Sequence, residues 1–78
     1  MTKQILSPLP GTFYRRPSPD KPMFKEVGDV VAVGDVIGLI EVMKSFNEVQ
    51  ADLAGTLTAF FADDEEPVMA GQPLAELG

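Results

Sequence analysis

Residues 31–39 read VAVGDVIGL and residues 68–76 read VMAGQPLAE, and this recurrence indicates the architecture of the chain. A second pair of similar stretches stands earlier in each half of the chain, LPGTF at residues 9–13 and LAGTL at residues 53–57. Self-similarity on this scale indicates that a supersecondary unit has been duplicated. Because the chain has only 78 residues, both copies must belong to one small domain.

The spacing of the two matches is not the same. Gly34 and Gly71 are 37 positions apart, whereas Gly11 and Gly55 are 44 positions apart. The first half therefore holds seven additional residues, and these must lie between Gly11 and Gly34.

A proline-rich segment at residues 16–22 is the candidate for this insertion. It consists of Arg16, Pro17, Ser18, Pro19, Asp20, Lys21 and Pro22. Proline cannot donate a hydrogen bond to a sheet ladder and favours an extended or turning loop. We predict a single domain over residues 1–78, with half-repeats of about 5–44 and 45–78, in which this loop is inserted into the first copy.

The rest of the chain reads as short strands separated by turn residues. Residues 12–15 and 56–61 are rich in β-branched and aromatic side chains and each follows a glycine. Residues 36–42 form a nearly continuous apolar run, interrupted by Gly38 and Glu41, and residues 47–51 alternate between apolar and polar. No segment of 11 residues that is free of Gly and Pro shows helical periodicity. The sequence therefore predicts an all-β fold of about eight short strands in two similar halves, a small barrel or sandwich.

A hairpin between residues 36–42 and 47–51 would place Met43, Lys44 and Ser45 at its tip. A lone lysine at a turn is by base rate a solubilising charge. Hairpin tips, however, are usually built from Gly, Asn, Asp or Pro, and apolar residues at such a position favour a surface that another protein recognises. Lys44 is also the last basic residue of the chain.

Composition excludes several classes of function. The chain has no cysteine and no histidine, which excludes disulfides, the usual zinc sites and Ser-His or Cys-His catalysis. The acidic run at residues 63–66 lacks the alternating spacing of a calcium loop, so we interpret it as a solvated turn and expect no metal site. The glycines do not form a phosphate-binding motif and are interpreted as turn positions.

The distribution of charge and apolar residues limits the partners. No apolar run approaches the ~20 residues that cross a bilayer, and the N-terminus lacks the apolar region of a signal peptide. Residues 45–78 hold seven acidic residues and no basic ones. We therefore expect no nucleic-acid or membrane partner and a cytoplasmic location, or a plastid if the chain is a fragment of a longer protein.

The stretch Glu41-Val42-Met43-Lys44 resembles the Glu-Ala-Met-Lys-Met signature of biotinyl domains. In that family the lysine lies at a β-hairpin tip and carries covalent biotin. The resemblance implies a flattened barrel of two four-stranded antiparallel sheets with quasi-twofold symmetry. It also assigns biotin attachment to Lys44 and ligase recognition to Glu41, Val42, Met43 and Ser45. Val42 departs from the usual Ala, and Ser45 departs from the usual Met.

Residues 11–20, GTFYRRPSPD, are similar to the biotin carboxyl carrier subgroup of bacterial or plastid acetyl-CoA carboxylase. In that subgroup an inserted loop, called the thumb, reaches toward the biotin. The resemblance identifies residues 16–22 as this thumb. It implies a non-catalytic carrier that is modified by a biotin protein ligase. Biotin carboxylase would load the carrier, and a carboxyltransferase would unload it toward acetyl-CoA in fatty acid biosynthesis, a part of lipid metabolism.

Two other functions fit the same residues. A lipoyl carrier domain has the same fold and lysine, but it normally shows Asp-Lys-Ala at the tip and lacks the thumb. An unmodified β module could use the hairpin as an interaction surface. A stand-alone enzyme is disfavoured, because no set of acid, base and nucleophile can be assembled.

Overall fold

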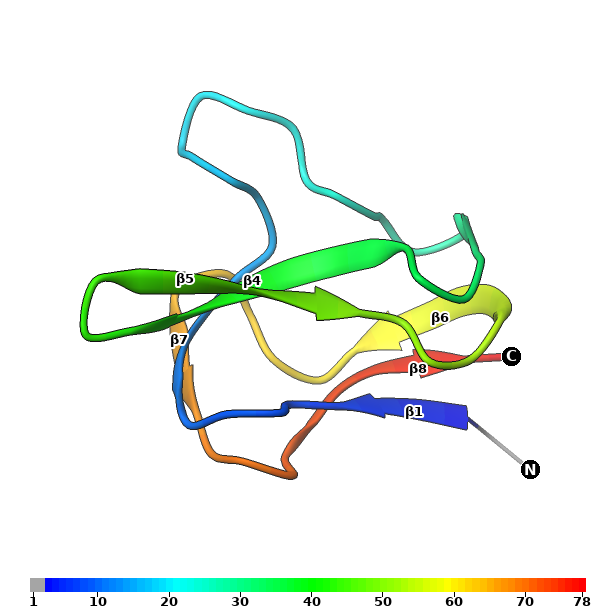
Figure 1. Ribbon diagram of the computed structural model, residues 1–78. Helices are drawn as coiled ribbons and strands as arrows, with labels where there is room; N and C mark the ends of the chain where they lie inside the picture. Colours follow the sequence, from blue (N-terminus) through cyan, green and yellow to red (C-terminus); the bar gives the residue numbers. More distant parts are fainter. Residues whose placement is uncertain (1–2) are drawn as a thin grey trace.

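A computed structural model describes residues 3–78, which form eight strands in two four-stranded antiparallel sheets (Figure 1). The strands are β1 (Lys3–Leu6), β2 (Gly11–Tyr14), β3 (Val30–Val31), β4 (Val36–Val42), β5 (Ser45–Gln50), β6 (Gly55–Phe60), β7 (Glu66–Val68) and β8 (Pro73–Leu77). The molecule measures 34 × 27 × 19 Å, a flattened shape. The predicted all-β class is confirmed, and the first two residues of the predicted domain lie outside the described part.

The two sheets have equivalent topologies. One has the strand order β1-β8-β6-β3 and the other β5-β4-β2-β7. Each strand of the first half has a counterpart four places later, so that β1 corresponds to β5, β2 to β6, β3 to β7 and β4 to β8. When every strand is replaced by its counterpart, the order of one sheet becomes the order of the other. Each sheet therefore takes two strands from each half of the chain, and the quasi-twofold symmetry expected from the repeats is confirmed.

Hydrogen bonds outside the sheets repeat in the same way. The Gly34 N–H donates to the Ala51 carbonyl at 2.7 Å, and the Gly71 N–H donates to the Ser7 carbonyl at 2.7 Å. Both glycines have positive φ, at 94° and 82°, a conformation that glycine adopts without a steric penalty. The two halves thus share backbone geometry as well as sequence.

Side chains from the facing sides of the two sheets fill one core. Its largest members, all almost fully buried, are Ile5, Phe13, Val31, Ile37, Ile40, Val49, Leu57, Leu74 and Leu77. They come from seven of the eight strands, so neither sheet has a core of its own. Burial of these apolar groups is the main term that stabilises the domain.

The strand boundaries differ from the predicted ones in one place that matters. Residues 12–15 and 56–61 were each predicted one residue late, whereas 36–42 is correct. The strand predicted over residues 47–51 instead begins at Ser45, because Val42 pairs with Ser45 and Glu41 pairs with Phe46. The hairpin is consequently longer, and its turn is shorter, than the apolar pattern indicated.

The insertion lies in the connection between β2 and β3. Gly28 has φ 102° and its repeat counterpart Glu65, 37 positions later, has φ 65°, so the repeats are in register from this point onward. The additional residues therefore precede Gly28 and follow β2. In Figure 1 this connection rises away from the barrel on the side of β4 and β5.

Glu65 offers a test of the repeat at the level of the backbone. A residue with a Cβ costs about 1–2 kcal/mol in the left-handed region, and glycine itself costs about 0.4–1 kcal/mol through the unfolded chain. Glu65→Gly is therefore expected to raise the free energy of unfolding by about 0.5–1 kcal/mol in a urea titration. Gly28→Ala is the matched control, since its added Cβ would meet nothing within 4 Å and only the backbone penalty remains. It should lower stability by about 1 kcal/mol. Destabilisation by Glu65→Gly would contradict the argument.

Candidate functional site

The tip of the β4–β5 hairpin is a two-residue turn made by Met43 and Lys44. Their φ values are 49° and 70°, and positive φ at both central residues is the requirement of a type I′ turn. Ser45, predicted to share the tip, instead begins β5. Neither turn residue is a glycine or asparagine, so the tip holds two side chains in an unfavourable conformation. Strain of this kind is concentrated at functional sites.

Lys44 is exposed in this turn. In Figure 1 the turn lies on the opposite side of the molecule from the end of the sheet where Lys3 of β1 pairs with Leu77 of β8. Two of the other three lysines of residues 3–78 have partners for their side-chain amines. Lys3 Nζ donates to the Ala54 carbonyl at 2.6 Å, and Lys25 Nζ lies 3.3 Å from Asp35 Oδ2. Only Lys21, on the thumb, shares with Lys44 an amine that forms no hydrogen bond or ion pair within the described residues.

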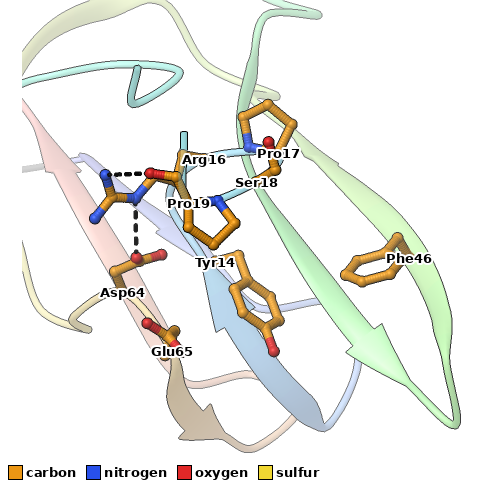
Figure 2. A pocket seen from close by; sticks show the side chains of 8 residues that line it. All are labelled: Tyr14, Arg16, Pro17, Ser18, Pro19, Phe46, Asp64 and Glu65. Atoms are coloured by element: carbon orange, nitrogen blue, oxygen red, sulfur yellow. Dashed lines mark hydrogen bonds and ion pairs between the residues drawn. The ribbon is translucent and has the colours of Figure 1, made fainter. Parts of the chain in front are cut away.

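A groove of about 310 Å³ lies between the thumb and the outer face of the sheet that carries the hairpin. Its lining residues are Tyr14, Arg16, Pro17, Ser18, Pro19, Phe46, Asp64 and Glu65 (Figure 2). Four of the predicted thumb residues, 16–19, thus face the hairpin strand β5 across the groove. Asp20, Lys21 and Pro22 are exposed and lie outside the lining.

The thumb is held against the barrel by Asp64. Arg16 Nε lies 3.3 Å from Asp64 Oδ2 (Figure 2). The Arg15 backbone N–H donates to Asp64 Oδ1 at 2.8 Å. The Asp64 side chain is only 16% exposed. The interpretation of residues 63–66 as a solvated turn is therefore wrong for Asp64, which bridges the second half of the chain to the thumb.

Short contacts also order the thumb internally. The Ser18 hydroxyl donates to Asp20 Oδ1 at 2.6 Å, and this bond, with the backbone N–H of Asp20, holds the pKa of the Asp20 carboxyl below its usual value. The Phe24 N–H donates to the Arg15 carbonyl at 2.8 Å, which brings the two ends of the thumb together. The thumb is therefore a closed loop on a narrow base.

Tyr14, the last residue of β2, connects the groove to the hairpin. Its hydroxyl donates to Glu41 Oε1 at 2.9 Å, and its ring lies 5.9 Å from the ring of Phe46. The hydrogen bond to Glu41, followed by desolvation, raises the pKa of the Tyr14 phenol above its usual value. The hydroxyl therefore remains protonated, and able to donate, at neutral pH.

Sequence reasoning identified one side of this site and missed the other. The predicted hairpin residues Glu41, Val42, Met43, Lys44 and Ser45 lie together around the turn, and residues 16–19 lie over β5. The structure adds four residues that the sequence did not assign to this site: Tyr14, Phe46, Asp64 and Glu65. The positive charge of Arg16 and the acidic run at 63–66 were visible in the sequence, but nothing there paired them.

Within residues 3–78 no cluster of three or more His, Cys, Asp or Glu side chains could hold a metal ion, and no helix has the length and apolarity that a bilayer crossing requires. The site instead offers an exposed primary amine beside a groove with aromatic, hydroxyl and carboxylate groups. Such an arrangement suits the covalent attachment of a small molecule by another enzyme, because no base capable of activating the amine lies near it in the sequence.

Comparison with known proteins places this geometry in a family. A family model described as "Biotin-requiring enzyme" matches residues 3–77. The chain is 46% identical over 70 residues to the biotin carboxyl carrier protein of acetyl-CoA carboxylase 2, chloroplastic, of Arabidopsis thaliana, covering 90% of this chain and 28% of that protein. It is 44% identical over 70 residues to the biotin carboxyl carrier protein of acetyl-CoA carboxylase of Haemophilus influenzae, covering 90% and 45%.

The chain thus spans about a quarter to a half of the length of these relatives. Among solved structures, the Kluyveromyces lactis urea carboxylase superposes with a TM-score of 0.79 at 26% identity, over 100% of this chain and 6% of that one. The match to the family model over nearly the whole described chain confirms the likeness drawn from residues 41–44. The chain belongs to the biotin/lipoyl attachment family of biotin-requiring enzymes.

Proposed function

We propose that this domain is a biotin carboxyl carrier, with biotin joined by an amide bond to Lys44. The observation that carries the proposal is the two-residue turn, which displays the exposed Lys44 amine at the end of the hairpin. The similarity to carrier proteins of acetyl-CoA carboxylase over 90% of the chain supports biotin as the attached group.

Attachment requires a separate biotin protein ligase. The chain has no histidine or cysteine to deprotonate the amine, so the ligase must supply the base and the activated acyl group. The chain's own contribution is recognition. Glu41, Val42, Met43 and Ser45 surround the lysine, and the Met43 side chain is 93% exposed, available for contact by a partner.

When bound, biotin supplies a carboxyl-carrying group that moves between two enzymes. We infer that these two enzymes are a biotin carboxylase and a carboxyltransferase, and that acetyl-CoA accepts the carboxyl group in fatty acid biosynthesis. The domain itself is not catalytic. Its role is to anchor, extend and orient the group. We place the activity in the cytoplasm or in a plastid, since similar carriers come from a bacterium and from chloroplasts.

The groove under the thumb fits the attached group. The ureido ring of biotin has two N–H donors and one carbonyl acceptor on an otherwise apolar bicycle. The groove offers carboxylate acceptors at Asp64 and Glu65, a hydroxyl at Ser18 and the ring of Phe46. These residues would hold the ring beside the barrel and limit its exposure to water.

The intact mass of the purified protein tests the proposal. The chain is co-expressed with a biotin protein ligase and a lipoate ligase, with both acids supplied, so that the two modifications compete. One added biotinyl group per chain is expected. A lipoyl group would instead identify a lipoyl carrier. An unchanged mass, with a known carrier fully modified in parallel, would leave an unmodified β module and refute the proposal.

Removal of the thumb separates attachment from carriage. Because the Phe24 N–H bonds to the Arg15 carbonyl, residues 16–22 can be replaced by Gly-Gly without stretching the chain. The second half shows that a short link suffices, since residues 61–65 alone join β6 to β7. The shortened domain is expected to fold and to be biotinylated at the normal rate. Its rate of carboxyl transfer in a reconstituted carboxylase should fall by about tenfold, because the ring is less well positioned.

A pair of point variants controls for the loop replacement. Asp64→Asn weakens the ion pair with Arg16 and should reproduce part of the loss in carboxyl transfer. Asp63→Asn, one residue away and exposed, should not. Full carboxyl transfer by the shortened domain would show that the thumb has no part in carriage.

A further inference from the structure

Tyr14 lies where the barrel, the hairpin and the thumb groove meet. In the register of the sheet, Thr12 is opposite Glu41 and Tyr14 is opposite Leu39. Tyr14 and Glu41 are therefore diagonal neighbours on the outer face, a separation that a long side chain can span. The tyrosine uses its full length to place its hydroxyl 2.9 Å from Glu41 Oε1. Glu41 in turn stands three positions before Lys44.

The same side chain contacts the second strand of the hairpin. Phe46 is the cross-strand partner of Glu41 and is 57% exposed, so the core gives it little support. Its ring packs against the Tyr14 ring at 5.9 Å with an angle of 56°. In Figure 2 Tyr14 lies between the thumb and the strand that carries Phe46. One residue of β2 thus fixes both strands of the hairpin just before the turn.

A free glutamate on a sheet surface samples many rotamers and loses that freedom when a partner binds it. A hydrogen bond to a charged carboxylate is stronger than one between neutral groups, so Tyr14 restricts Glu41 before any encounter. Restricting a group in its bound orientation lowers the entropic cost of binding. The benefit appears in the affinity for the partner and leaves the chemistry at the lysine unchanged.

We propose that Tyr14 is a positioning residue for the modification of Lys44: its hydroxyl presets the Glu41 carboxylate in the orientation that the ligase binds. The inference rests on the proposed function and adds a residue outside the hairpin motif to the recognition surface. It requires that the hydroxyl act through Glu41 and through no other group.

A double-mutant cycle tests this requirement. The rate of biotinylation by a purified biotin protein ligase is measured for the wild type, Tyr14→Phe, Glu41→Ala and the double variant, with KM and kcat determined separately. Tyr14→Phe is expected to raise KM about fivefold, the entropic cost of ordering one flexible side chain on binding, with kcat unchanged. In the Glu41→Ala background the same substitution should change KM by less than about twofold.

Thr58 supplies the matched control. It stands 44 positions after Tyr14, at the equivalent place in the second half, and its Oγ1 donates to Glu76 Oε1 at 2.9 Å. Thr58→Val removes a similar hydroxyl–carboxylate bond from the other sheet and should leave KM unchanged. Thermal unfolding of every variant separates recognition from stability.

The outcomes are distinguishable. An unchanged KM for Tyr14→Phe, or an equal increase with and without Glu41, overturns the positioning role while the carrier function stands. A wild-type chain that the ligase does not label overturns the proposed function, and this inference with it. A KM increase that disappears in the Glu41→Ala background supports both.

Discussion

Lys44→Arg is expected to abolish biotinylation completely while the domain remains folded. Arginine keeps the positive charge and most of the side-chain length, but its guanidinium is a poor nucleophile because it stays protonated at neutral pH. The backbone of the turn should be unaffected, because lysine and arginine each have a Cβ and meet the same steric restriction at φ 70°. Intact mass and streptavidin capture, after co-expression with a biotin protein ligase, measure the loss.

Lys21→Arg is the control for this substitution. Lys21 is the other lysine of residues 3–78 that is exposed without a hydrogen bond or ion pair, and it belongs to the thumb. The Lys21 variant should be labelled as fully as the wild type. Labelling of Lys44→Arg, or loss of labelling in Lys21→Arg, would contradict the assignment of biotin attachment to Lys44.

Phe13→Ala is expected to have the largest effect on stability, a loss of about 3–5 kcal/mol. The Phe13 side chain is fully buried at the centre of the core. Its ring packs directly over Gly38 of the neighbouring strand, where a Cβ would lie 2.5 Å from Phe13 Cε1. Because glycine has no side chain to fill the space, removal of the ring leaves a cavity that the sheet cannot close.

A domain of this size has a small margin of stability, so the loss should lower the midpoint of thermal unfolding by at least about 12 °C. Circular dichroism during heating measures it. Phe61→Ala removes the same side chain from a site that is 47% exposed and should cost less than about 1 kcal/mol. Equal losses for the two variants would contradict the assignment of Phe13 to the core.

The architecture was readable from the sequence because the repeat carries its own geometry. Gly34 and Gly71 match in the sequence and share positive φ and the same type of hydrogen bond in the structure. The 44-position and 37-position offsets likewise indicated an insertion before any strand was assigned. Both signals come from comparing the sequence with itself, so each is recognisable without knowledge of the three-dimensional contacts.

The turn could not be defined from the sequence. Met43 and Lys44 adopt positive φ without the glycine or asparagine that normally marks such a position, so Ser45 was assigned to the tip. The sheet decides otherwise, because the ladder from Val36 to Val42 continues to pair up to Ser45. Tertiary pairing outweighs the local preference of the turn residues here.

The contacts that complete the groove are also absent from local patterns. Asp64 meets Arg16 across 48 positions of sequence, and Tyr14 meets Glu41 across 27. No periodicity links such residues. They come together only because each sheet combines strands from both halves. In the second sheet β2 lies between β4 and β7, which places the end of β2 beside the hairpin and beside the turn that precedes β7.

The sharing of strands between the two sheets also bears on the number of attachment sites per domain. A twofold arrangement normally doubles every surface feature, yet the β4–β5 turn is the covalent joint between the two copies, and a joint of this kind occurs once. The barrel can therefore be quasi-symmetric and still present a single β4–β5 turn, with a single Lys44. On the proposed function, one domain delivers one carboxyl group per visit, and the partner enzymes meet a single end of the molecule in a single orientation.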